Sequence, residues 1–266
     1  MAYEAAPMNL DLKCEDYQLI NQFKLKDKVV VVVGGANGIG EACANYMASL
    51  GSHIIILDKD GAAAKSVSEN IPNSLSFELD ICDANQIDEV FEQVPSVDVL
   101  VNSAGVARRQ PALDHNKSDW DLVANVNTTG SFLCAQAAAR KMVKAKQPGC
   151  ITNIASIMGL SGGGIYPNVS YQTSKGAVVN MTRALAVEWA PYDIRVNSVA
   201  PTYVRTEFIR PLLDDPYTVR RIEEMTPLGK IAEPGDVAAA VAFLSSSAAS
   251  MITGHTLPVD GGFLAQ

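Results

Sequence analysis

Residues 27–40, DKVVVVVGGANGIG, decide the fold of this chain. Five consecutive valines, Val29–Val33, form a β-branched apolar run that is typical of a strand buried on both faces of a parallel sheet. Four glycines follow within seven residues, and the stretch after them, EACANYMASLG (residues 41–51), has the pattern of a helix. The sequence therefore predicts a strand, a tight glycine loop and a helix in direct succession.

The glycine loop has the spacing of a loop that binds the pyrophosphate of a dinucleotide, and a turn without a ligand is the alternative. Its glycines permit a tight turn, a close approach of the backbone to a phosphate, and close packing of the helix on the sheet. The helix N-terminus directs free N–H groups and the positive end of its dipole toward the same phosphate. The loop residues that we expect to contact a dinucleotide are Gly34, Asn37, Gly38, Ile39 and Gly40.

The second apolar run, SHIIILD (residues 52–58), ends in an acidic residue that bears on the choice between NAD and NADP. At this position the Asp58 carboxylate would accept hydrogen bonds from the adenosine ribose and repel a 2′-phosphate. Asn37 brings no cation for such a phosphate, although Lys59 is adjacent to Asp58. The sequence therefore predicts NAD as the cofactor, with NADP less favoured. The adenine edge is expected to meet two further residues, Asp80 and Ile81.

Beyond this unit, strand and helix patterns alternate to the end of the chain. Short links join them, which implies right-handed βαβ units and a parallel sheet with helices on both faces. We therefore predict an α/β fold, a single-domain Rossmann fold with a doubly wound, seven-stranded parallel sheet. The expected strands are 29–33, 52–58, 74–80, 97–105, 150–156, 193–200 and 255–260. The expected helices are 41–51, 62–71, 84–94, about 118 onward, 128–146, 171–190 and 233–246.

Two segments fall outside this alternation. Residues 1–24 lack strong periodicity and are expected to be an N-terminal extension, so that the Rossmann domain covers residues 25–266. Residues 202–232 contain several prolines with charges between them and show no clear pattern. Long irregular segments of compact domains often cover a binding site, and we predict a substrate lid at about 202–232.

Composition excludes several classes of protein. Hydrophobic residues make up 48% of the 266 residues, and the formal net charge of −8 argues against nucleic acid or an anionic membrane as a partner. No apolar run approaches the ~20 residues of a membrane span, and the N-terminus does not have the pattern of a signal peptide. Five scattered cysteines without a Cys-x-x-Cys pair favour reduced thiols in a cytoplasmic protein over a disulfide framework or a metal site.

The stretch YQTSK (residues 171–175) places a tyrosine and a lysine four residues apart. On a helix, Tyr171 and Lys175 share a face, so the lysine ammonium is expected to lower the pKa of the phenol. A phenol of lowered pKa suits proton transfer near neutral pH. Such a pair also occurs by chance on soluble helices, so its meaning depends on the rest of the chain.

Together these motifs closely resemble the short-chain dehydrogenase/reductase family, in particular its NAD-dependent polyol and sugar dehydrogenases, from about residue 24 to the C-terminus. The resemblance is carried by the glycine loop and by NSAG (102–105), NTTGSF (127–132), NIAS (153–156), YQTSK, RVNSVAP (195–201) and VDGG (259–262). It implies a catalytic set of Asn127, Ser156, Tyr171 and Lys175, with Asn125 as the alternative to Asn127. It implies cofactor contacts from Asn102, Ala104, Gly105, Tyr171, Lys175, Pro201, Val204 and Thr206.

The resemblance also implies a reaction, hydride transfer between a nicotinamide and a substrate carbon. Tyr171 would exchange a proton with the substrate oxygen, Ser156 would hydrogen-bond that oxygen, and Asn127 would position a water beyond Lys175. We expect an NAD-dependent oxidoreductase that interconverts a secondary alcohol and a ketone, on a polyol, sugar or sugar acid. The alternatives are a 3-oxoacyl thioester reductase and a protein that has kept the fold without the chemistry. The family further implies a homotetramer.

The substrate side is less specific. Thr202 stands where the family usually has a glycine, which affects the start of the predicted lid. Substrate contacts are expected from the lid, from residues 161–166, and from Arg108 and Arg109. Arg109 and Arg205 are candidates for holding a negatively charged substrate, and a surface role is the alternative for both.

Overall fold

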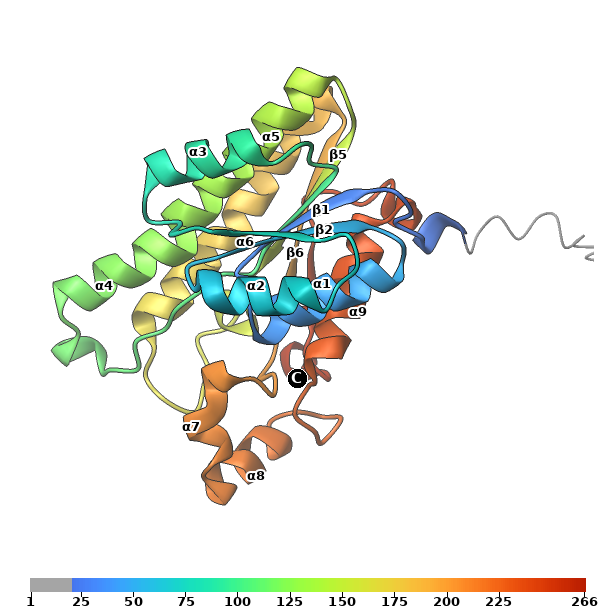
Figure 1. The fold of residues 1–266 in the computed structure, drawn as a ribbon. Helices are drawn as coiled ribbons and strands as arrows, with labels where there is room; N and C mark the ends of the chain where they lie inside the picture. The colour runs from blue at the N-terminus through green and yellow to red at the C-terminus, as the bar shows by residue number, and fades with distance from the viewer. Residues whose placement is uncertain (1–20) are drawn as a thin grey trace, which may run out of the picture.

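A computed structural model describes residues 21–266, which form a three-layer α/β domain (Figure 1). Its seven strands form one parallel sheet in the order β3-β2-β1-β4-β5-β6-β7, which confirms the predicted doubly wound Rossmann sheet. The strands are β1 (Val29–Val33), β2 (His53–Asp58), β3 (Leu75–Glu78), β4 (Val99–Asn102), β5 (Gly149–Ile154), β6 (Ile194–Pro201) and β7 (Thr256–Val259). The helices are α1 (Gly38–Ser49), α2 (Gly61–Glu69), α3 (Ala84–Gln93), α4 (Lys117–Ala124), α5 (Ser131–Ala145), α6 (Val169–Trp189), α7 (Arg210–Leu213), α8 (Pro216–Glu224) and α9 (Pro234–Ser245).

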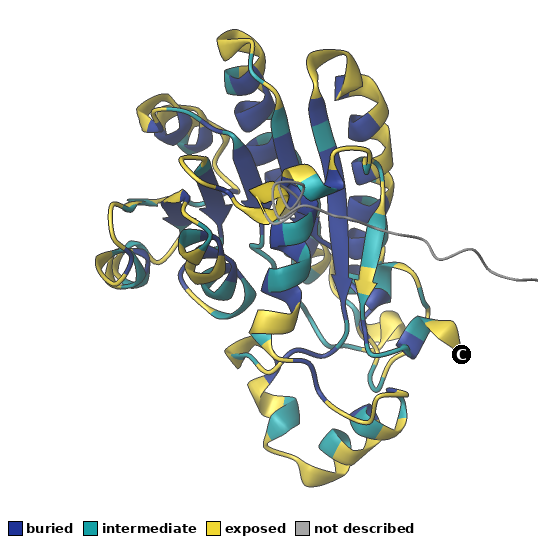
Figure 2. Ribbon diagram, turned by 90° about the vertical axis from the view of Figure 1, so that its right-hand side faces the viewer, coloured by how far each residue is buried: buried dark blue, intermediate teal, exposed yellow. Residues whose placement is uncertain are grey.

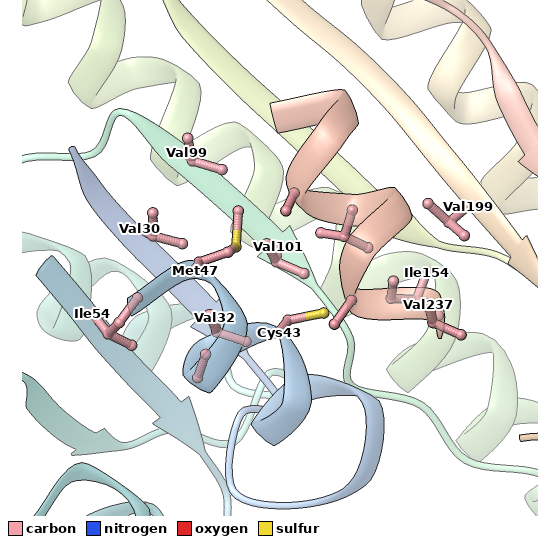
Figure 3. Packing of buried hydrophobic residues seen from close by; sticks show 14 of the residues in the cluster. Val30, Val32, Cys43, Met47, Ile54, Val99, Val101, Ile154, Val199 and Val237 are labelled. Atoms are coloured by element: carbon pink, nitrogen blue, oxygen red, sulfur yellow. The ribbon is translucent and has the colours of Figure 1, made fainter. Parts of the chain in front are cut away.

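Each face of the sheet carries its own apolar core, because successive residues of a strand point to opposite faces. On one face Val30 and Val32 pack with α1, α2 and α9, and Figure 3 shows Met47 of α1 in this cluster. On the other face Val31 and Val33 pack with α3, α5 and α6. The central strands β1, β4, β5 and β6 are accordingly deeply buried, whereas the edge strands β3 and β7 are partly exposed (Figure 2). The unbroken valine run of β1 follows from this burial on both faces.

The order of the strands reverses between β1 and β4, which are neighbours in the middle of the sheet. At such a point a crevice opens at the carboxyl ends of the strands. The loops that follow β1, β4, β5 and β6 leave the sheet at this edge, and α7 and α8 lie beyond it (Figure 1). The topology therefore brings the motifs after these strands to one place, as the sequence predicts.

Residues 202–232 are more regular than predicted, because they contain the helices α7 and α8. Helix α8 begins at Pro216, and the side chain of Asp215 accepts hydrogen bonds from two backbone N–H groups of its first turn. An aspartate cap followed by a proline is a strong signal for a helix start. The other prolines of this segment obscure that signal in the sequence.

The two helices expected from about residue 118 and over 128–146 are joined without a break. One π-helical turn, Asn125–Gly130, links α4 to α5. Single π turns within α-helices are rare and are frequent at functional sites. This turn contains Asn127, one of the four predicted catalytic residues.

The first described residues pack against the domain. Residues 21–23 form a short 3₁₀ turn, and the ring of Phe23 stacks on Phe243 of α9 with a centroid distance of 6.2 Å. The end of the expected N-terminal extension is therefore in contact with α9, whereas residues 1–20 of that extension lie outside the described residues. None of the described helices is both long and apolar enough to cross a membrane.

Candidate active site

A cavity of about 390 Å³ opens at the carboxyl edge of the sheet. Most of the site residues predicted from the sequence line this cavity, although they lie far apart in the chain. These residues are Gly34, Asn37, Gly38, Ile39, Asp58, Asp80, Ile81, Ala104, Gly105, Ser156, Tyr171, Lys175, Pro201, Val204 and Thr206. Gly40, Asn102 and Asn127 are buried and are not among the residues that line this cavity.

The loop after β1 has no room for side chains at two of its glycines. A Cβ atom on Gly34, whose φ is +73°, would come within 2.5 Å of the backbone nitrogen of Ala104. A Cβ atom on Gly40 would overlap the carbonyl oxygen of Gly34. Asn37 occupies the N-cap of α1, but its side chain makes no capping hydrogen bond. The first N–H groups of α1 therefore face the cavity edge without a side-chain cap, as a pyrophosphate cradle requires.

The Asp58 carboxylate lines the same cavity beside the glycine loop. Its two oxygens accept hydrogen bonds from the backbone N–H groups of Ala36 at 3.0 Å and Asp60 at 3.1 Å. These bonds fix the carboxylate beside the glycine loop, and each oxygen keeps a second lone pair for a ribose hydroxyl. The glycine cradle and this carboxylate together fit the adenosine half of a dinucleotide.

The cation nearest to that carboxylate in sequence is already paired. Lys59 Nζ lies 2.6 Å from an Asp80 carboxylate oxygen. The hydrogen bond from Lys59 holds the pKa of Asp80 below its usual value, and a backbone hydrogen bond from Cys82 acts in the same direction. Asp80, which the sequence analysis assigns to the adenine edge, therefore has its carboxylate bound to Lys59.

Ser156, Tyr171 and Lys175 meet on the opposite side of the cavity. Ser156 follows β5, and Tyr171 and Lys175 lie one turn apart on α6. Lys175 is 4% exposed, and its Nζ donates a 2.7 Å hydrogen bond to the carbonyl oxygen of Ile154. The same Nζ lies 5.6 Å from the centre of the Tyr171 ring. The predicted pair thus shares one face of a helix and points into the cavity region.

The pKa of Tyr171 differs from the expectation. Burial raises the pKa of Tyr171 to about 12, while hydrogen bonding with Ser156 and the charge of Arg109 act to lower it. Burial also lowers the pKa of Lys175 to about 8. The predicted lowering of the phenol pKa by Lys175 is therefore not seen, because desolvation of the phenol dominates.

Asn127 is fully buried and acts as a link between elements. Its Oδ1 accepts a hydrogen bond from the N–H of Val106, and its Nδ2 donates to the carbonyl of Val106 and to Ser174 Oγ. The alternative, Asn125, is exposed at the start of the π turn. The geometry therefore places Asn127 beside the helix that bears Tyr171 and Lys175, and Asn125 away from it.

Asn102 has a comparable supporting position at the end of β4. Its side-chain amide donates to the carbonyl of Ser131 and to Asn153 Oδ1, at 3.0 and 2.9 Å. These bonds tie β4 to α5 and β5. The residues that follow, Ala104 and Gly105, line the cavity themselves. Asn102 therefore supports the loop that contributes Ala104 and Gly105 to the cavity lining.

Of the three arginines considered from the sequence, Arg109 is the one beside the reaction centre. Its Nη2 donates a 3.0 Å hydrogen bond to the carbonyl of Phe208, and its guanidinium carbon lies 5.0 Å from the centre of the Tyr166 ring. Arg108 is bound to Asp119, and Arg205 is bound to Glu233. The last two are thus paired on the surface, whereas Arg109 connects the loop after β4 with the segment 202–232.

Several lining residues escaped the sequence analysis. The Phe208 ring lies 6.0 Å from the Tyr171 ring, centre to centre, and Met158, Asn168 and Tyr203 also line the cavity. Thr206, two residues before Phe208, lies against the glycine loop, because a Cβ atom on Gly38 would meet its Cγ2 at 3.2 Å. None of these positions has a motif of its own. Phe208 and Tyr203 lie within the predicted lid, and an aromatic residue in that segment would have been the available signal for each.

Comparison with known proteins agrees with this geometry. A family model described as Enoyl-(Acyl carrier protein) reductase matches residues 34–264. A 3-oxoacyl-(acyl-carrier-protein) reductase of Aquifex aeolicus is 38% identical, covering 91% of this chain and 99% of its own. An NAD-dependent glycerol dehydrogenase of Listeria innocua is 37% identical, with 91% and 95% covered. A galactitol 2-dehydrogenase (L-tagatose-forming) of Cereibacter sphaeroides is 38% identical, with 93% and 98% covered.

Solved structures show the same likeness in three dimensions. A short-chain type dehydrogenase/reductase from Mycobacterium marinum has a TM-score of 0.88 and 33% identity, covering 93% of this chain and 100% of its own. A gluconate 5-dehydrogenase from Burkholderia cenocepacia, in complex with NADP and tartrate, has a TM-score of 0.89 and 30% identity, with 93% and 99% covered.

Proposed function

The chain belongs to the short-chain dehydrogenase/reductase family, and from that premise we propose that it is an NAD-dependent dehydrogenase that converts a secondary alcohol of a polyol or sugar acid to a ketone. One observation carries the proposal. Ser156, Tyr171 and Lys175 line the same cavity as the glycine cradle and Asp58. A proton-transfer group and a dinucleotide site therefore share one space.

The chemistry divides between the cofactor and the chain. When bound, the nicotinamide supplies the position that accepts or gives the hydride. In the reductive direction the protonated Tyr171 phenol donates its proton to the substrate oxygen. Ser156 hydrogen-bonds the same oxygen and stabilises charge that develops on it. Asn127, which is buried, holds the Val106 backbone and Ser174 in place around Lys175.

In the oxidative direction Tyr171 has to accept the proton of the substrate hydroxyl, so its pKa must fall below the value of about 12 seen here. Hydrogen bonding with Ser156 and the positive charge of Arg109 act in that direction, because each favours the phenolate. The positive charge of an oxidised nicotinamide acts in the same way. We infer that binding of the oxidised cofactor activates Tyr171 as a base.

Two features support NAD rather than NADP. The Asp58 carboxylate lines the cavity beside the glycine loop, and its negative charge would repel a 2′-phosphate bound there. Lys59, the adjacent cation, is paired with Asp80 at 2.6 Å rather than free for a phosphate. Relatives of both kinds exist, since the Listeria glycerol dehydrogenase is NAD-dependent and the Burkholderia structure holds NADP.

The second candidate is a 3-oxoacyl thioester reductase, which the Aquifex relative favours. Arg109 favours a smaller, polar substrate over an acyl thioester, because its guanidinium lies near the rings of Tyr166 and Phe208 beside the reaction centre. A carboxylate of a sugar acid would find a cation there. A neutral polyol would instead use the hydroxyl and amide groups of the same wall.

We further propose that the protein is a cytoplasmic homotetramer that binds neither membrane nor nucleic acid. Val187 of α6 and Met251 before β7 are apolar and 78% and 94% exposed, which suits burial between subunits. Cys43, Cys134 and Cys150 are buried free thiols, as in proteins of a reducing compartment. Light scattering after size-exclusion chromatography measures the oligomeric state.

The test of the activity is a set of initial rates with NAD and with NADP, over threitol, galactitol, gluconate and a 3-hydroxyacyl thioester. Oxidation of a polyol or of gluconate, with NAD preferred, is the expected result. Turnover of the thioester alone, with NADP, would support the second candidate function, that of a 3-oxoacyl thioester reductase. Binding of NAD without turnover of any alcohol would contradict the enzymatic proposal for this substrate class.

A further inference from the structure

A second pocket of about 370 Å³ lies beside the reaction cavity. Gly164, Tyr166 and Asn168 line both spaces, so the two share a wall between the loop after β5 and the start of α6. The other lining residues of this second pocket are Ala112, Gly162, Ile165, Pro167, Val169 and Gln172. The pocket thus continues the reaction cavity away from the cofactor side.

Asn168 in the shared wall has an unused hydrogen-bond acceptor. The residue is 6% exposed, and its Oδ1 is buried without a hydrogen-bond partner among the described residues. It also occupies the N-cap of α6, yet its side chain makes no capping hydrogen bond. An asparagine at an N-cap ordinarily accepts a hydrogen bond from an N–H group of the first turn. Asn168 therefore does not serve the helix in the way its position suggests.

A second amide follows one turn later on the same face of α6. Gln172 lines the second pocket, and its Nε2 reaches no closer partner than the sulfur of Met158, at 3.8 Å. Residues four apart on a helix are neighbours on its surface. Two amide side chains, those of Asn168 and Gln172, therefore line this pocket.

The lining of the second pocket is neutral, since it has amide, phenol and backbone groups but no carboxylate, ammonium or guanidinium. Such a lining suits the hydroxyl groups of an uncharged carbon chain rather than a phosphate or a thioester carrier. Asn168 is the N-cap of α6 and precedes Tyr171 by three residues, and both residues line the reaction cavity. A hydroxyl a few carbons from the reacting carbinol would thus reach Asn168.

We propose that this pocket is a distal substrate subsite for the hydroxyl-bearing tail of a polyol, and that Asn168 Oδ1 accepts a hydrogen bond from one tail hydroxyl. The inference rests on the proposed function and narrows it to substrates longer than a simple diol. In this proposal Asn168 discriminates between substrates with a hydroxyl-bearing tail and shorter diols. A buried acceptor that loses its partner weakens binding, and one such hydrogen bond corresponds to about a tenfold change in kcat/KM.

The experiment compares N168A with N116A in the full-length protein. Asn116 is the N-cap of α4, and its side chain does accept a hydrogen bond from the N–H of Asp119, at 2.8 Å. The substrates are galactitol, whose chain carries hydroxyls on every carbon, and 2,3-butanediol, which ends one carbon beyond the reacting pair. Thermal unfolding of both variants is measured alongside kcat/KM with NAD.

The expected result for N168A is a loss of about tenfold in kcat/KM for galactitol, with the value for 2,3-butanediol within about twofold of wild type. N116A should lower the unfolding temperature and leave the ratio of the two substrates unchanged. An equal loss on both substrates in N168A would overturn the proposal, since a structural role has that signature. Wild-type turnover of 2,3-butanediol without turnover of galactitol would also overturn it, while the dehydrogenase function stands.

If the wild-type protein oxidises neither substrate, the proposed function has failed on these alcohols and the subsite is judged by binding. Galactitol is then titrated calorimetrically into the NAD complex of wild-type and N168A protein. Heat of binding in the wild type that is absent from N168A supports the subsite. No binding to the wild type, or equal binding to both, overturns it.

Discussion

The two sides of the cavity are built on different principles. The cofactor side is made largely of backbone, namely the turn at Gly34 and the uncapped start of α1, and the acidic side chain of Asp58 is held there by two backbone N–H groups. The substrate side is made of side chains from loops, among them Arg109 and Phe208. The first side is fixed by steric exclusion, so few sequences can form it. The second tolerates change, so it can differ between relatives that share one chemistry.

The largest effect is expected where the two sides meet. Y171F removes the hydroxyl that exchanges a proton with the substrate, and general acid–base catalysis contributes roughly 10²–10⁴-fold. We expect kcat to fall by that factor while the Kd for NAD, from fluorescence titration, stays within about twofold. The control is Y203F, which removes a hydroxyl from the same cavity and should retain most of the activity. Full activity in Y171F would remove Tyr171 from the mechanism.

Steric exclusion on the cofactor side is tested with a pair of glycines. The added methyl group of G40A would overlap the carbonyl of Gly34, and overpacking of this kind costs about 1–3 kcal/mol. Gly162 has nothing within 4 Å of its Cβ position, so G162A should change the free energy of unfolding by less than ~0.5 kcal/mol. Urea unfolding measures both variants. Equal stability of the two would show that the loop adapts and that the cofactor side is not rigid.

Lys175 gives a pH dependence of stability with a definite sign. Its pKa is about 8 in the folded protein, against 10.5 as the ordinary value, so between these limits the unfolded chain binds more protons. The free energy of unfolding should therefore rise with pH from about 8, by ~1–2 kcal/mol at pH 9.5. K175M lacks this gain. Urea unfolding at pH 7.5, 8.5 and 9.5 measures the difference, and parallel curves for the two proteins would show that the buried amine is not destabilised.

The cofactor preference is tested at Asp58 against its neighbour Asp60. D58N removes the charge that opposes a 2′-phosphate, and we expect the ratio of kcat/KM for NADP to that for NAD to rise about tenfold, which is on the order of 1.4 kcal/mol. The control is D60N, which removes one carboxylate charge at a neighbouring residue whose side chain caps α2 and does not line the cavity. An unchanged ratio in D58N would mean that another group sets the preference.

The smallest effect is expected on the substrate side of the cavity. R109Q removes the cation beside Tyr166 and Phe208, and R205Q removes one that is paired with Glu233. With gluconate as substrate, KM should rise about three- to tenfold in R109Q, because an exposed charge contact contributes on the order of 1 kcal/mol. KM for galactitol should stay near wild type in both variants. A similar rise on the neutral polyol would assign Arg109 to shaping the loop instead of binding charge.

This division also explains what could be predicted from the sequence. The glycine spacing, Asp58 and the Tyr171–Lys175 pair depend on neighbours close in the chain, so local patterns reveal them. The contact of Arg109 with Phe208 joins residues 99 apart and depends on how two loops meet in space. Asn168 has no local signal at all, since its free acceptor follows from a cap that it does not make. The raised pKa of Tyr171 likewise arises from burial, which spacing on a helix does not convey.

The contacts of Thr206 and Phe208 have a consequence for the order of events in a catalytic cycle. These residues are two apart on one segment, with Thr206 against the glycine loop and Phe208 against the Tyr171 ring. A displacement of that segment would uncover the glycine loop and the Tyr171 ring together. Release of the two products would then be coupled through this segment, and a single opening rate would limit both.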